Sequence, residues 1–201
     1  MLISCIQLDQ LLAELKRPTK SLVTLMDKQE QLKSSLISIP QGRRLQLLMA
    51  SNDLGSIMHK LAAIQGTVEM MECMTSCIER RNYFNLMKIQ DECGQTALHV
   101  AARNKHLSAV ICMLEHLLPN DRLTILEMKD TGRLTTFHHL LRNDTSGEWI
   151  IAHVLPRVDP AHLDTFLRMQ LGSMDELEPN VIEALEAYKE SLCTTTQAAP
   201  G

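Results

Sequence analysis

The chain has 201 residues, with 20 Lys and Arg against 24 Asp and Glu, so its net charge is −4. This balance argues against nucleic acid or an anionic membrane as the main partner. The 45% hydrophobic and 3% aromatic content, mostly Leu, Met, Ile and Ala, favours helices and excludes collagen-like repeats and disorder along the whole chain. No apolar window is long enough to span a membrane. Without a recognisable export signal, we expect the six cysteines to be reduced and the protein to be cytoplasmic or nuclear.

The chain opens with two apolar stripes at helical spacing. The first covers 8–15 and is stopped by Pro18, and the second covers 22–36 and is stopped by Pro40. We interpret residues 1–44 as an N-terminal helical cap. A coiled-coil seam is the alternative for the second stripe, but Gln29 occupies one seam position and the stripe has too few heptads.

The sequence then repeats itself. When it is shifted by 39 residues, 67–91 lies without gaps on 106–130, and the apolar pattern agrees along most of the segment. The identical pairs are Cys73 with Cys112, Met74 with Met113 and Asp91 with Asp130. A period of about 20–50 residues indicates a stack of supersecondary units that bury their apolar faces against one another.

Each unit is expected to be helical. In the best-preserved unit, 91–95 predicts a turn, and Thr96 caps a helix predicted over Ala97 to Arg103. A second helix is predicted over 107–118, where Pro119 ends it. The apolar residues that follow predict a short third helical turn.

Residues 94–102 read Gly-Gln-Thr-Ala-Leu-His-Val-Ala-Ala and resemble the ankyrin repeat, whose pattern is G-x-T-P/A-L-H-x-A-A. The resemblance is strong over 91–118 and weaker over about 45–170. Lys105 stands where the family usually has a second glycine, which predicts a less tight turn between the two helices. In the degenerate next unit the glycine, Gly132, comes one place early.

The resemblance implies an all-α, ankyrin-like helical repeat solenoid of about four units with helical caps at both ends. The predicted divisions are an N-terminal cap over 1–44, repeats over 45–172, a C-terminal capping helix over 173–193 and a disordered tail over 194–201. The resemblance also implies a non-enzymatic module that needs no cofactor or metal. It would bind another protein through the concave face of the stack, bind no nucleic acid or membrane, and be monomeric when unbound.

On the family's geometry, the turn tips and the exposed ends of the first helices would carry the binding residues. These are Gln90, Glu92, Gln95, Arg103, Asn104, Lys129, Thr131, Arg142 and Asn143. Arg103 and Arg142 occupy one column of the repeat, so we expect a basic strip that suits an acidic segment of a partner. The alternative is that both are merely solvated helix ends.

Other chemistry has a structural alternative in each case. His99 and His138 could form a catalytic pair, but a recurring column favours a structural hydrogen bond to the backbone. The cysteines at 73, 77 and 112, and the histidines at 138, 139 and 153, could bind metal, but core packing is favoured. The methionines could line a groove, although Met71, Met74 and Met113 fall on core columns.

Three other functions remain open. The chain could be an inhibitory or assembly subunit that makes contact through its caps. It could be the ankyrin portion of a larger multidomain protein. It could also be an enzyme that uses His99 or His138.

Overall fold

The computed structural model describes residues 30, 31, 34, 37, 38, 40, 46, 48–52, 55–75, 78–143, 147–171 and 179–197. Most of the cap predicted over 1–44 lies outside these residues, including the first apolar stripe. The described residues form ten α-helices and one short two-stranded sheet, in which β1 (Ser51–Asn52) pairs antiparallel with β2 (Gly55–Ser56). The predicted all-α repeat architecture is confirmed.

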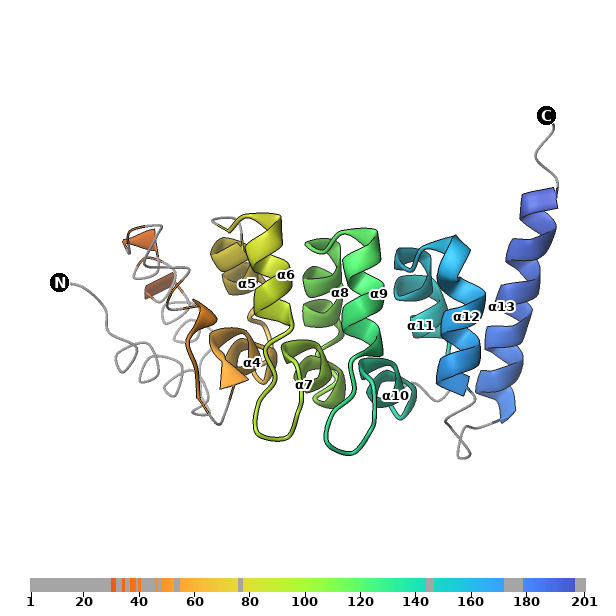
Figure 1. Cartoon of the computed structure of the whole chain (residues 1–201), viewed down its shortest axis with the longest axis horizontal. Coiled ribbons are helices and arrows are strands. Elements are labelled where there is room, and N and C mark those ends of the chain that lie inside the picture. Colours follow the sequence, from red (N-terminus) through yellow and green to blue (C-terminus); the bar gives the residue numbers. More distant parts are fainter. Residues whose placement is uncertain are drawn as a thin grey trace.

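Nine of these helices form three successive units of three. The first unit contains α4 (Ile57–Ala62), α5 (Val68–Thr75) and α6 (Arg80–Met87). The second contains α7 (Ala97–Arg103), α8 (Leu107–Glu115) and α9 (Pro119–Glu127). The third contains α10 (Thr136–Leu141), α11 (Glu148–His153) and α12 (Pro160–Leu171), with a 3-10 turn at Leu155–Arg157. In Figure 1, α4, α7 and α10 form the lower layer, and the other two helices of each unit form the upper layer.

The third element of each unit is a full helix rather than the predicted short turn. The second helix, α8, ends at Glu115 instead of residue 118, and Pro119 opens α9 at a first-turn position. Proline is well suited there because the first N–H groups of a helix have no intrahelical partner. The hydroxyl of Tyr83 in α6 also donates to the carbonyl of Met113 in α8, at 3.2 Å, and so joins the first unit to the second.

The three units share one continuous core. Ala101 and Ala102 are completely buried, and such small side chains let α7 pack closely between α4 and α10. Met71, Met74 and Met113 are also buried, so their assignment to the core is confirmed.

Beyond the third unit, α13 (Pro179–Gln197) packs against α11. Val181 and Leu185 form its buried face, and a Cβ atom at Gly147 would lie 3.4 Å from Val181. The helix begins later than the predicted boundary at 173 and continues past 193, where a disordered tail is predicted. Residues 172–178 and 198–201 lie outside the described residues. No helix in the described part is long and apolar enough to cross a membrane.

Candidate protein-binding face

Each lower-layer helix begins with the same polar contact, which fixes a histidine in its first turn. The Nδ1 atoms of His59, His99 and His138 accept from the backbone N–H groups of Ser56, Thr96 and Thr135 at 3.1, 3.2 and 3.2 Å. A backbone N–H can only donate, so each Nδ1 is an acceptor and the proton of the neutral ring lies on Nε2. The predicted structural hydrogen bond of the His99 and His138 column is confirmed.

These rings are almost completely buried, at 2%, 0% and 3% exposure for His59, His99 and His138. Burial lowers the pKa of all three, and that of His99 falls to about 4, with the neighbouring His139 contributing. Nε2 of His59 lies 2.9 Å from the carbonyl of Gln95 and joins the first unit to the second. The three histidines therefore act as neutral structural groups at the start of each helix.

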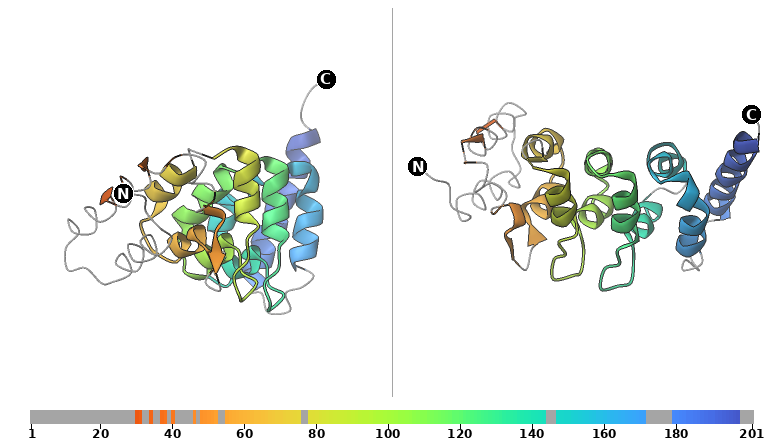
Figure 2. Two further views of the ribbon diagram at one scale, coloured as in Figure 1. Left: turned by 60° about the vertical axis from the view of Figure 1, so that its left-hand side comes forward. Right: turned by 45° about the horizontal axis from the view of Figure 1, so that its top comes forward.

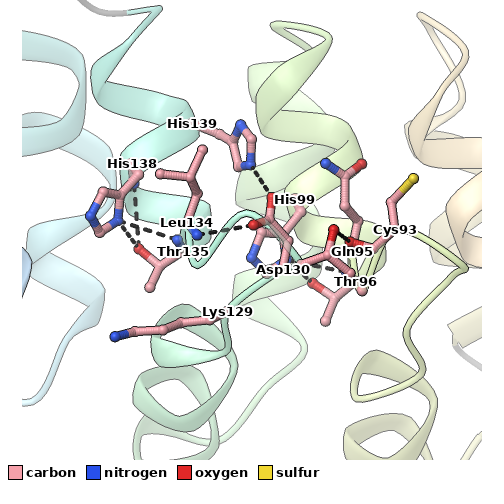
Figure 3. Close-up of polar contacts among 12 residues, drawn as sticks. Cys93, Gln95, Thr96, His99, Lys129, Asp130, Leu134, Thr135, His138 and His139 are labelled. Carbon is pink, nitrogen blue, oxygen red and sulfur yellow. Dashed lines mark hydrogen bonds and ion pairs between the residues drawn. The ribbon is translucent and has the colours of Figure 1, made fainter.

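Two loops, 88–95 and 128–135, project from the lower edge of the stack (Figure 1). An aspartate shapes each: Oδ1 of Asp91 accepts from the N–H groups of Cys93 and Gln95, and Oδ1 of Asp130 accepts from that of Leu134. Oδ2 of Asp130 also lies 2.9 Å from Nε2 of His139 (Figure 3). Burial alone would raise the pKa of Asp130, but the hydrogen bonds it accepts lower it overall.

The two loops are hydrogen-bonded to each other. The N–H and the hydroxyl of Thr131 donate to the carbonyl of Cys93 at 3.0 and 2.9 Å, and Nε2 of Gln90 donates to the carbonyl of Lys129 at 3.1 Å. Gly94 has a φ of 68°, and a Cβ there would lie 2.9 Å from the nitrogen of Thr131, so glycine permits this close approach. Gln90 and Thr131, predicted to bind a partner, thus hold the loops together.

Two more predicted binding residues have structural contacts at the ends of the lower-layer helices. Nδ2 of Asn104 donates to the carbonyl of Val100 at 2.8 Å. Nδ2 of Asn143 donates to the carbonyl of Ala102 in the preceding unit at 2.8 Å and to that of His139 at 3.0 Å. These amides cover helix carbonyls that would otherwise lack partners, and Asn143 also joins α10 to α7.

Gln95 does not lie on the surface. Its side chain is only 5% exposed and forms a hydrogen bond with Asp130, which turns it into the space between units. Its predicted place on an exposed turn tip is therefore wrong. Of the nine predicted residues, those left exposed with no contact described above are Glu92, Arg103, Lys129 and Arg142.

Arg103 and Arg142 occupy equivalent positions, each seven residues after the threonine that precedes its helix. Both are exposed, and within the described part of the chain neither forms an ion pair. Lys105, which sequence analysis did not include, is exposed two residues beyond Arg103. We call Arg103, Lys105 and Arg142 the basic strip. A cation at the family's glycine position was the signal that could have revealed the third member.

The turn after α7 is as tight as a glycine turn would be. Lys105 takes a φ of 62°, close to the 78° of Gly66, which lies 39 residues earlier. The N–H of His106 closes the turn on the carbonyl of Ala101 at 3.0 Å. The prediction of a looser turn was wrong, because Lys105 adopts the left-handed conformation itself. Arg133 does the same in the 128–135 loop, with a φ of 63°, and takes the place of a glycine in the position of Gly94.

Metal binding finds no support in the residues that the structure describes, which contain no group of three or more His, Cys, Asp or Glu side chains placed to hold an ion. Cys77 lies outside them. Cys112 is a buried free thiol whose pKa is raised to about 12, mainly by burial. It is therefore protonated and packs as a small apolar group.

The geometry defines a helical repeat protein with an exposed edge and a rigid, hydrogen-bonded interior. Residues 93–121 match the family model of the ankyrin repeat, and they contain α7, α8 and the start of α9. Comparison with curated proteins and with solved structures finds no significant match. The chain thus carries an ankyrin repeat, a unit typical of protein–protein interaction modules.

Proposed function

We propose that the chain is a non-enzymatic module that binds an acidic segment of a partner protein through the basic strip. The observation that carries this proposal is the exposure of Arg103, Lys105 and Arg142 at the ends of α7 and α10, with no acidic residue in the intervening 97–110 segment. Arginine suits this role because its planar guanidinium group donates two parallel hydrogen bonds to a carboxylate.

The contacts beneath the strip support such a role. Asn143 and Ala102 join α10 to α7 directly below the arginines. A strip held by packed helices is ordered before the partner arrives, so binding does not have to order the backbone that carries it. The free thiols of Cys93 and Cys112 fit a reducing compartment, which supports the cytoplasm or nucleus as the place of binding.

Affinity capture from source-cell lysate tests the proposal with a matched control. The test variant is Arg103→Glu/Arg142→Glu. The control is Arg80→Glu/Arg81→Glu, which makes the same charge change at exposed positions at the start of α6. We expect a specific protein to be recovered by the wild type and the control but not by the test variant. Equal recovery by all three proteins, with unchanged circular dichroism, would refute binding through the strip.

A further inference from the structure

The last helix carries a second charged surface. In α13, Glu183, Glu186 and Glu190 are exposed, whereas Val181 and Leu185 are buried against the stack. At 100° per residue the three glutamates lie on the side opposite the buried pair. Glu183 and Glu190 are two helical turns apart and point in nearly the same direction, about 10.5 Å from each other along the axis. We call these glutamates the acidic stripe.

The basic strip has a similar spacing. Arg103 and Arg142 lie at equivalent positions of α7 and α10, which pack directly against each other. Packed helices have axes about 8–10 Å apart. Two carboxylates of the acidic stripe are therefore separated by nearly the same distance as the two guanidinium groups of the basic strip.

We infer that the acidic stripe of one copy binds the basic strip of a second copy. This inference rests on the proposed function, because it uses the same strip and names a second copy of this chain as a ligand. Within one chain, α13 packs on α11 and its glutamates lie on the opposite face of that helix, so the contact forms between copies. Each copy supplies one strip and one stripe, which allows a closed dimer with two identical contacts.

Exposed ion pairs contribute little individually and are screened by salt. The association is therefore weak, with a dissociation constant of about 0.1–1 mM at low ionic strength. A dilute chain remains monomeric, as the sequence predicts, and its strip is available to a tighter-binding partner. Self-association would thus compete with the partner only where the protein is concentrated.

Sedimentation equilibrium of the full chain at low and high salt tests the inference. The strip-reversed variant is Arg103→Glu/Arg142→Glu, and the stripe-reversed variant is Glu183→Lys/Glu190→Lys. We expect each variant alone to associate at least about tenfold more weakly than the wild type. An equimolar mixture of the two should regain the wild-type association, because each reversed surface meets its complement. The control Arg80→Glu/Arg81→Glu should behave as the wild type does.

A wild type that stays monomeric at millimolar concentration and low salt would overturn the inference, as would association that survives either reversal. Variants that lose association without regaining it in the mixture would overturn it too. The outcome is separable from the proposed function. A monomeric wild type that still loses its captured partner on strip reversal would refute self-association alone. Complementary self-association with unchanged partner capture would refute the proposed function alone.

Discussion

Acidification from pH 7 to pH 5 is expected to destabilise the stack through His99. This ring is completely buried, and its pKa is lowered from 6.5 to about 4, mainly because burial disfavours the charged form. Between these two values the unfolded chain binds a proton that the folded chain does not. Stability is therefore complete above about pH 6.5 and decreases as the pH falls towards 4.

The expected loss follows from the two pKa values. With 6.5 in the unfolded chain and about 4 in the folded chain, His99 lowers the free energy of unfolding by about 2 kcal/mol at pH 5 and by about 3 kcal/mol at pH 4. The added proton would go to Nδ1 and break the contact with the N–H of Thr96 at the start of α7. Burial also lowers the pKa of His59 and His138, so both add losses of the same sign.

Urea unfolding followed by circular dichroism at pH 7, 6 and 5 would measure this loss. The variant His99→Asn keeps an acceptor oxygen near the Nδ1 position but cannot titrate. It should be less stable than the wild type at pH 7 and lose about 2 kcal/mol less on going to pH 5. Replacing the exposed His162 by Asn is the matched control and should keep the wild-type dependence. Equal pH dependence in the wild type and His99→Asn would refute the role given to His99.

Three further substitutions test individual contacts, each by thermal or urea unfolding at pH 7. Lys105→Gly should stabilise the fold by about 1 kcal/mol because glycine takes a positive φ without strain, whereas Asn104→Gly, at a negative φ, should destabilise it. A loss of stability in Lys105→Gly would contradict this. Asn143→Ala removes hydrogen bonds to two helix carbonyls and should cost about 1–2 kcal/mol, and no loss would mean that the α10–α7 link is dispensable. Tyr83→Phe should cost about 1 kcal/mol if the hydroxyl contact between the first two units contributes to stability, and a neutral result would exclude it.

The repeat and the start of α7 could be predicted because they depend on local signals. Thr96 and the following small and apolar residues fix the helix over Ala97–Arg103, and the structure has the same bounds. The period of 39 residues also predicted extra helical structure after α8. Its extent was underestimated because Pro119 was interpreted as the end of one helix, whereas it begins the next. A proline is compatible with both roles, and only packing between helices decides.

The site was predicted less well because surface position does not reveal hydrogen bonding across units. Asn143, Gln90 and Thr131 are polar and lie where ankyrin proteins contact partners, but each bonds a backbone carbonyl of a neighbouring unit or loop. Those partners are 38–41 residues away in sequence, so local patterns cannot identify them. Lys105 was missed because a glycine consensus drew attention to the turn instead of to the charge.

Hydrogen–deuterium exchange of the chain, alone and with its captured partner, tests the central claim most directly. It reports which backbone amides become protected on binding. The account predicts that new protection is concentrated at the end of α7, in the turn at Lys105 and at Arg142, and is absent in Arg103→Glu/Arg142→Glu. Protection confined to α13, or to the upper-layer helices α6, α9 and α12, would contradict binding through the basic strip.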